Sequence, residues 1–334
     1  MFFKLIPGYI LLVIIAVIAT YGSKLVEVGG KHPIEPAVLA ILIGMVLVNS
    51  KRVPQSCVEG VKAFEKPLIW GIVLMGASLN IATIISQGFT TLWIILITMT
   101  IGLITVYAVA RAFKLSDNLS ILLALGTSIC GGTAIAVTAP LIKAKEEETS
   151  YAIGTIAIWG LLAIIIYPKL AQFLGVSDDI FGIFAGTAIH STPQVVGAGF
   201  IFSEAAGRTA TAVKLVRNCF LAPAAFLAML WQAHREHNTV SQVEQTAVKK
   251  AFPWFLFGYF VMAWLNSKGL FSESVQSTCS EAGKFLILLG MVGVGLNTRF
   301  DSFRKIGAKP LIVGFVGAIA VATSSIILIS KLLM

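Results

Sequence analysis

The sequence predicts an all-α polytopic membrane protein with about eleven transmembrane helices, an inverted repeat and two broken helices. Of its 334 residues, 57% are apolar or aromatic and 12% are charged, and its mean hydropathy is +0.89. Soluble domains are nearer ~45 to 50% apolar and ~25% charged, so an ordinary water-soluble enzyme is excluded. Residues 67–110 include no Asp, Glu, Lys, Arg or His. Because one bilayer-spanning helix needs ~20 mostly apolar residues, this stretch is long enough for two crossings.

Charged or turn-rich loops separate eleven charge-poor runs of roughly the length that a bilayer demands. The runs are residues 5–21, 34–49, 67–85, 90–110, 119–142, 151–167, 180–202, 209–231, 251–266, 282–296 and 310–330. The first run resembles a secretory signal, but the residues after it make a poor cleavage site, so we expect it to be a span. No run of polar residues is long enough for a soluble domain. Residues 1–334 are therefore expected to form a single transmembrane domain.

The distribution of loop cations predicts the orientation of the chain. With the amino terminus in the cytoplasm, fifteen Lys and Arg side chains fall on the inner side and eight on the outer side. Lys143 and Lys145 count as outer and Lys169 as inner, whereas Lys214 and Arg217 fall inside a run. The amino terminus is therefore expected inside and the carboxyl terminus outside.

The net charge of +9 and the four cysteines suggest neither nucleic acid nor metal as a partner. In a membrane chain, an excess of cations is explained by loop orientation. The cysteines form no CxxC pair, and their spacing suits neither a zinc site nor a disulfide framework. No cofactor is expected, and the expected partners are the lipid bilayer, a small anionic substrate and a second copy of the chain.

Two pairs of short motifs suggest internal repetition. Residues 76–80 (Gly-Ala-Ser-Leu-Asn) lie in the third run and residues 293–297 (Gly-Val-Gly-Leu-Asn) end the tenth, seven runs further on, so the copies would point in opposite directions, as in inverted-repeat transporters. The alternative is chance, because Gly and Leu are abundant. The second pair, Gly126-Thr127 and Gly186-Thr187, is two runs apart and fits inversion only if one segment is re-entrant.

The fifth run has a centre that is poorly suited to a continuous helix. Residues 126–133 read Gly-Thr-Ser-Ile-Cys-Gly-Gly-Thr, and glycines weaken a helix interior. Free backbone groups inside a bilayer are tolerated only where protein or a wet cavity surrounds them. We therefore expect a broken helix, with a new half-helix beginning near Thr133. The alternative is that the small residues only allow close helix packing.

The seventh run carries the second expected break. Thr192 before Pro193 has the form of a helix N-cap followed by proline in the first turn, and His190, Ser191 and Gln194 flank it. A half-helix beginning at Thr192 would direct free amides and a positive dipole end toward an anion near the membrane centre.

Lys214 and Arg217 lie on one face of the eighth run, with Asn218 beside them. A charged side chain deep in a membrane costs at least ~2.5 kcal/mol, so each needs a reason. One reading is snorkelling to the headgroups; the other is a cationic lining for an anion. The runs hold almost no Asp or Glu, whereas Glu146, Glu147 and Glu148 precede the sixth run, where acids stabilise a helix amino end.

The motif blocks at residues 126–131, 139–148, 189–199 and 213–217 resemble, in this order, the sulfate exporter family of YeiH-like bacterial inner-membrane proteins. The resemblance covers nearly the whole chain. It implies a polytopic secondary carrier in the bacterial inner membrane, with sulfate or sulfonate-type anions as substrates. Ser191 stands where many members have an acidic residue, so the coupling ion is left open.

These observations favour a non-enzymatic exporter of a small inorganic or organosulfur anion that works by alternating access. The runner-up is an anion channel, and the third alternative is an intramembrane enzyme that uses His190 with Cys130 or Ser191, although the sequence has no metalloprotease or paired-carboxylate signature. The expected anion-binding residues are Thr127, Ser128, Thr133, His190, Ser191, Thr192, Gln194, Lys214, Arg217 and Asn218.

Overall fold

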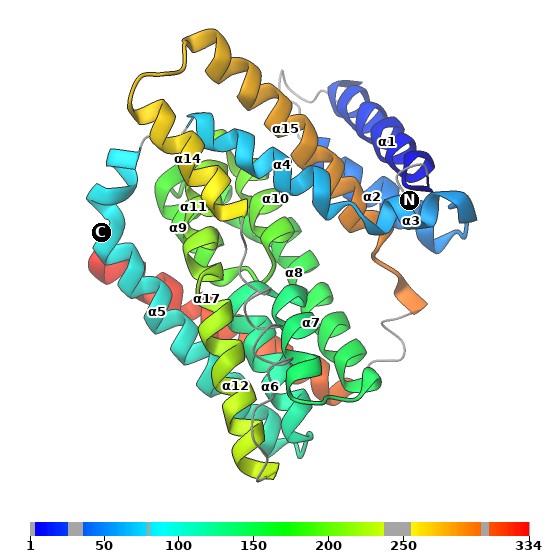
Figure 1. Ribbon diagram of the computed structural model, residues 1–334, viewed down its shortest axis with the longest axis vertical. Helices are drawn as coiled ribbons and strands as arrows, with labels where there is room; N and C mark the ends of the chain where they lie inside the picture. The colour runs from blue at the N-terminus through cyan, green and yellow to red at the C-terminus, as the bar shows by residue number, and fades with distance from the viewer. Residues whose placement is uncertain (1–3, 26–35, 79–80, 237–254, 302–306, 334) are drawn as a thin grey trace. The chain divides into compact units, whose positions relative to one another are not determined.

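A computed structural model describes residues 4–25, 36–78, 81–236, 255–301 and 307–333 (Figure 1). Within these ranges every regular element is helical, which confirms the predicted all-α class. Six helical segments are long and apolar enough to cross a membrane: Ile6–Ser23, Gly88–Ala112, Glu146–Phe173, Glu204–Gln232, Glu273–Leu296 and Ala308–Leu332. Shorter apolar helices cover Pro36–Asn49, Asp117–Cys130, Gly132–Leu141 and Thr192–Phe202.

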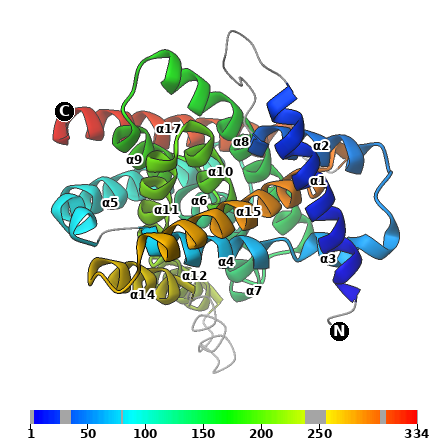
Figure 2. The same cartoon turned by 90° about the horizontal axis from the view of Figure 1, so that it is seen from above.

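The helices group into two compact units, each built from segments that are distant in sequence (Figures 1 and 2). Unit 1 comprises residues 1–84 and 255–301, and unit 2 comprises residues 85–254 and 302–334. The described helices of unit 1 are α1 (Ile6–Leu25), α2 (Pro36–Asn49), α3 (Val58–Lys62), α4 (Glu65–Met75), the short η3 (Gly76–Ser78), α14 (Phe255–Ser267) and α15 (Glu273–Leu296). The expectation of a single transporter domain stays a prediction.

Unit 1 is held together by helices that approach closely at glycines. A Cβ atom built on Gly71 of α4 would lie 2.8 Å from the carbonyl oxygen of Gly283 on α15, and a Cβ on Gly290 would lie 2.8 Å from the Leu68 side chain. Small residues allow this backbone approach in membrane helices. The pairing of 71 with 283 and of 68 with 290 makes α4 and α15 antiparallel.

The antiparallel pair bears on the predicted inverted repeat. The second motif copy ends α15, where Asn297 donates from Nδ2 to the Val61 carbonyl oxygen at 3.3 Å. The first copy follows α4 as η3, whereas Leu79 and Asn80 lie outside the described residues. The helices that precede and carry the two copies therefore run in opposite directions, as inversion requires.

Unit 2 contains most of the long α5 (Ile81–Ala112), α8 (Glu146–Phe173) and α17 (Ala308–Leu332). Its shorter helices are α6 (Asp117–Leu125), the π-helical η4 (Gly126–Cys130), α7 (Gly132–Leu141), α9 (Asp178–Ala188), α10 (Thr192–Phe202), α11 (Glu204–Asn218) and α12 (Leu221–Glu236). Each predicted break is present, at Gly131 between η4 and α7 and at residues 189–191 between α9 and α10.

The first broken segment, residues 117–141, folds back on itself. Ser116, which precedes α6, donates to one carboxylate oxygen of Glu148, and the backbone amide of Lys145, which follows α7, donates to the other at 2.9 Å. Both ends of the segment therefore lie beside the start of α8. At the opposite end, a Cβ atom on Gly126 would lie 2.8 Å from the Ile135 side chain. We call this segment the first hairpin.

The second broken segment, residues 178–202, folds back in the same way. The Phe181 and Phe202 rings, at its two ends, stack with centroids 4.2 Å apart. Cβ atoms built on Gly182 of α9 and Gly199 of α10 would both lie close to the carbonyl oxygen of Ala206, at 3.0 and 3.2 Å. This segment is the second hairpin.

A segment that folds back in this way returns to the side on which it begins, so in a bilayer we expect both segments to be re-entrant. The sequence left open whether the runs 119–142 and 180–202 cross fully or re-enter, and the hairpin geometry favours re-entry. The first hairpin ends at the start of α8 and the second begins just after its end, and α8 has 28 residues, or ~42 Å at 1.5 Å per residue. The hairpins thus enter from opposite ends of α8 (Figure 1), which satisfies the inversion condition for the Gly126 and Gly186 motifs.

The hairpin geometry predicts which loops share a side of the membrane. Single cysteines at positions 114 and 145, in a chain whose native cysteines are replaced by alanine, should react with an impermeant maleimide from the same side. Position 174, beyond α8, should react from the opposite side. Labelling of 114 and 145 from opposite sides would show that residues 117–141 cross the membrane.

Candidate functional site

The tips of the two hairpins meet inside unit 2. Gly131, at the tip of the first hairpin, has φ 68° and ψ −130°, a conformation that L side chains rarely adopt. A Cβ atom on Gly131 would lie 2.8 Å from the Cβ atom of Ser191, at the tip of the second hairpin. Glycine is therefore required here both by backbone conformation and by the approach of the opposite tip.

Arg217 of α11 joins the two tips and is fully buried. Its guanidinium donates to carbonyl oxygens of both hairpins: Nε to Ser128 at 2.7 Å, Nη2 to Thr127 at 2.8 Å, and Nη1 to Gly186 at 3.2 Å, Thr187 at 2.8 Å and Ile189 at 2.9 Å. These carbonyls end the first arm of each hairpin, where helix carbonyls lack intrahelical partners and the dipole is negative. Arg217 thus caps two helix ends at once.

Lys214, one turn earlier on α11, makes a second bridge between the tips. Its Nζ donates to the carbonyl oxygens of Ile129 at 2.7 Å, Ile189 at 3.3 Å and His190. Three acceptors match the three N–H bonds of an ammonium group. Lys214 is fully buried, so the snorkelling reading is wrong for both cations.

The amino ends of the second arms lie at the same tips. Helix α7 begins at Gly132 and α10 at Thr192. The N-cap of α10 is Ser191, so the expectation that Thr192 is the cap is wrong by one residue, because Thr192 already has helical geometry. Gln194 Oε1 accepts from the Ser191 amide at 3.1 Å, which satisfies a donor at this helix start.

Asn218 and Thr192 connect α11 to the start of α10. Asn218 Nδ2 donates to Thr192 Oγ1 at 3.0 Å, and Asn218 Oδ1 is buried without a hydrogen-bonding partner among the residues that the structure describes. The structure therefore places Ser191, Thr192 and Asn218 together at the tips. Thr133, which was also predicted for the site, is the second residue of α7 and is exposed.

His190 lies at the tip of the second hairpin and is 1% exposed. Neither of its ring nitrogens makes a hydrogen bond of normal geometry to a described residue, although the backbone of Ala188 lies close to the ring. A buried polar group without a partner costs about 1 to 3 kcal/mol. Such a cost is unusual enough to suggest that a ligand or water completes the site.

Thr127 and Ser128 contribute their carbonyls rather than their hydroxyls to the bridge. Within the described part of the chain, their buried side-chain oxygens have no hydrogen-bonding partner. Both side chains lie against glycines of neighbouring helices: a Cβ on Gly102 of α5 would be 2.6 Å from Ser128 Oγ, and one on Gly317 of α17 would be 3.2 Å from Thr127 Cγ2.

The structure also adds a contact that sequence reasoning missed. Thr187 Oγ1 and Ser325 Oγ of α17 lie 2.7 Å apart and share a hydrogen bond. The adjacent hydroxyls of Ser324 and Ser325 in an otherwise apolar run were the available signal.

Glu146, Glu147 and Glu148 occupy the first turn of α8, as predicted for acids that stabilise a helix amino end. Glu148 also links that turn to Ser116, as described above. These acids therefore lie at the open ends of the first hairpin, away from its tip.

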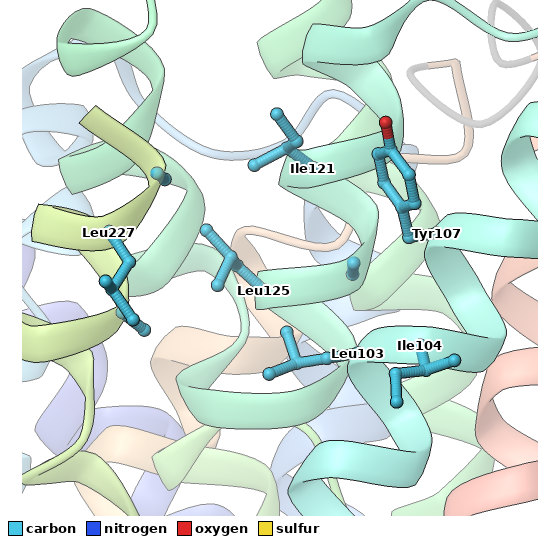
Figure 3. A pocket seen from close by; sticks show the side chains of 9 residues that line it. Leu103, Ile104, Tyr107, Ile121, Leu125 and Leu227 are labelled. Carbon is cyan, nitrogen blue, oxygen red and sulfur yellow. The ribbon is translucent and has the colours of Figure 1, made fainter. Parts of the chain in front are cut away.

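A groove of about 330 Å³ lies elsewhere in unit 2, on α5, α6 and α12 (Figure 3). Its lining is apolar apart from Tyr107: Leu103, Ile104, Tyr107, Ile121, Ala124, Leu125, Ala224, Leu227 and Ala228. Because it offers no cation and no helix amino end, this groove does not suit an anion, and the hairpin tips remain the candidate site.

Two opposed helical hairpins whose tips are joined by buried cations, within a chain of long apolar helices, define a polytopic helical membrane protein with a central polar site. The family model described as "Conserved hypothetical protein 698" matches residues 7–314. The chain belongs to this family, whose curated relatives are UPF0324 membrane proteins.

The relatives match over most of their length as well as most of this chain. A UPF0324 membrane protein of Bacillus cereus (strain ATCC 10987 / NRS 248) is 34% identical over 320 residues, which cover 96% of this chain and 89% of the relative. One from Oceanobacillus iheyensis is 36% identical over 284 residues, with 84% and 83% covered. One from Streptococcus pyogenes serotype M3 is 32% identical over 330 residues, with 96% and 95% covered.

Proposed function

We propose that the chain is a secondary transporter, an exporter, of a small inorganic or organosulfur anion such as sulfate or a sulfonate, in the bacterial inner membrane. The observation that carries this proposal is the pair of fully buried cations, Lys214 and Arg217, at the meeting point of the hairpins. Within the described part of the chain, these two side chains donate to backbone carbonyls of both hairpins.

Anion binding follows from the polarity of the four helix ends. The carbonyl ends of the first arms face the cations, which leaves the amino ends of α7 and α10 to meet a ligand. Helix amino ends bind anions through free amides and a positive dipole. Buried His190 supplies ring nitrogens that make no hydrogen bond of normal geometry in the described chain, and Ser191 and Thr192 supply hydroxyls beside them. The anion thus binds the first amides of α7 and the Thr192 amide of α10, since Pro193 has no N–H, whereas Lys214 and Arg217 position the tips and contribute their charge.

Alternating access is supported by the two-unit architecture. A carrier needs one body that moves and one that supports it, and the chain divides into two compact units, with the complete site inside unit 2. A channel could use the same donors, so it remains the second candidate. The enzyme alternative has less support, because the described Asp and Glu residues of unit 2 lie at helix ends away from the tips, so none of them is placed to orient His190 beside Cys130 or Ser191.

The hairpins refine the proposed membrane topology to nine full crossings and two re-entrant hairpins. Relative to the eleven-crossing scheme, Lys143 and Lys145 move to the inner side and Lys169 moves to the outer side. The inner side gains two cations and loses one, so fifteen against eight becomes sixteen against seven. This stronger bias supports a cytoplasmic amino terminus and an outer carboxyl terminus.

Purified protein in liposomes loaded with labelled sulfate, sulfite or methanesulfonate tests the proposal. We expect saturable release of at least one anion that is accelerated by the same unlabelled anion on the opposite side. Such exchange requires a carrier, since a pore gives no acceleration. Release without exchange would favour the channel, and the absence of release for all three anions would contradict the proposed function.

Thr192→Val is expected to weaken anion binding about tenfold. The change removes a tip hydroxyl that can donate to the anion, and a hydrogen bond to a charged group contributes about 1.5 to 3 kcal/mol, where about 1.4 kcal/mol corresponds to tenfold. Thr149→Val is the matched control, because Thr149 Oγ1 donates to Lys145 O at 3.1 Å on an exposed helix start. Equal affinities of the two variants, measured by titration with sulfate, would remove Thr192 from the site.

A further inference from the structure

The charge at the hairpin tips is not balanced by acidic side chains. The described Asp and Glu residues of unit 2 lie at helix ends: Asp117, Glu146, Glu147, Glu148, Asp178, Asp179 and Glu204 in first turns, and Glu236 at the end of α12. Lys214 and Arg217 donate to carbonyl oxygens, and carbonyls satisfy hydrogen bonds without cancelling a full charge.

The four helix ends at the tips also cancel one another. Each helix end carries about half an elementary charge, negative at a carbonyl end and positive at an amino end. Two carbonyl ends, of η4 and α9, and two amino ends, of α7 and α10, meet there. Their sum is close to zero, so the two cations leave a local charge of about +2.

The protonation of Lys214 supports this count. Its Nζ has three carbonyl acceptors, and a neutral amine could serve only two of them as a donor. The other titratable groups at the tips are His190 and Cys130, which are both buried. Cys130 interacts electrostatically with both cations, and the count of +2 applies to a neutral His190 and a thiol at Cys130.

We propose that the anion carried by this site is divalent and that it moves without a coupling cation. This inference rests on the proposed function. A dianion neutralises the +2 site, whereas a monoanion leaves a net charge in a region where unpaired charge is costly. A sodium or proton site built on a carboxylate has no candidate at the tips. The membrane potential, negative inside, then drives the dianion outward, since each charge gains ~2.3 kcal/mol per 100 mV.

The number of charges moved per anion tests the inference directly. Liposomes that contain the protein are clamped with potassium and valinomycin, and labelled sulfate is followed to its final distribution. At about 59 mV, a dianion that moves alone should reach about a hundredfold ratio across the membrane, whereas one charge per anion gives about tenfold. We expect about a hundredfold for sulfate, with no requirement for sodium or a pH gradient.

Other outcomes overturn the inference in distinguishable ways. A tenfold sulfate concentration ratio across the membrane, or a flux that does not respond to the potential, contradicts the movement of two charges per anion. Either result is still consistent with anion transport. Accumulation that needs sodium or a proton gradient contradicts uncoupled movement. If none of sulfate, sulfite and methanesulfonate is transported, the proposed function itself is contradicted.

A charge-removing variant gives an independent readout. Lys214→Gln reduces the site charge by one, so its preference for sulfate over methanesulfonate should fall at least tenfold, even if both rates decline. Lys331→Gln removes an exposed cation at the end of α17 and should keep the wild-type preference. An unchanged preference in Lys214→Gln would overturn the inference, and if that variant does not fold, the charge ratio of the wild type decides.

Discussion

Replacing Arg217 with Met should unfold the hairpin tips and abolish transport together. The change keeps much of the side-chain volume but leaves buried carbonyls of both hairpins without donors. Removing one partner of a buried charged network costs ~3 to 5 kcal/mol, a large part of a typical stability of ~5 to 15 kcal/mol. We therefore expect a large fall in the thermal unfolding temperature of the detergent-solubilised protein and no anion flux.

Arg208→Met provides the control on the same helix. Arg208 lies near the exposed start of α11 and pairs with Glu204 at 3.4 Å, and surface ion pairs contribute ~0 to 1 kcal/mol. Arg217→Lys should restore little of the lost stability or transport, because one ammonium group cannot reproduce the planar guanidinium that reaches the carbonyl oxygens of both hairpins. A stable Arg217→Met variant with wild-type transport would contradict the bridging role.

Gly131→Ala should separate the hairpin tips. The positive φ of 68° costs ~1 to 3 kcal/mol for a residue with a side chain, and the new Cβ would meet Ser191 Cβ at 2.8 Å, an overpacking that costs a further ~1 to 3 kcal/mol. We expect a loss of stability comparable to that in Arg217→Met, measured by thermal unfolding in the same detergent.

Gly175→Ala separates the two causes. Gly175 also has a positive φ, 67°, but a Cβ there would meet nothing within 4 Å. Gly175→Ala should therefore lose only the stability that the strained backbone conformation costs, and it should keep its transport activity. If Gly131→Ala were no more harmful than Gly175→Ala, the close approach of the two tips would be refuted.

The broken helices were predictable from sequence because their causes are local. Glycines 131 and 132 and the Thr192-Pro193 pair disfavour a continuous helix wherever they lie. Whether the chain then continues across the membrane or turns back depends on distant contacts, such as Ser116 with Glu148 and Phe181 with Phe202. Runs of 20 to 25 apolar residues look the same in both cases, so the sequence left open whether these two segments cross the membrane or re-enter.

The roles of the two cations were only partly predictable. Charged residues within an apolar run indicate a function, and the sequence singled out Lys214 and Arg217 for that reason. Their partners are backbone carbonyls, which every residue carries, so no sequence pattern identifies them. The sequence therefore singled out the two cations, but it could not show that their N–H donors contact backbone carbonyls of the two hairpins.

The position of the bound anion is the most direct test of the account. In crystals grown with saturating selenate, which scatters anomalously and has the shape and charge of sulfate, an anomalous difference map should show one peak at the hairpin tips, beside the first amides of α7 and α10 and near His190. A peak elsewhere, or empty tips at a selenate concentration that blocks sulfate exchange, would contradict the assignment of the anion site.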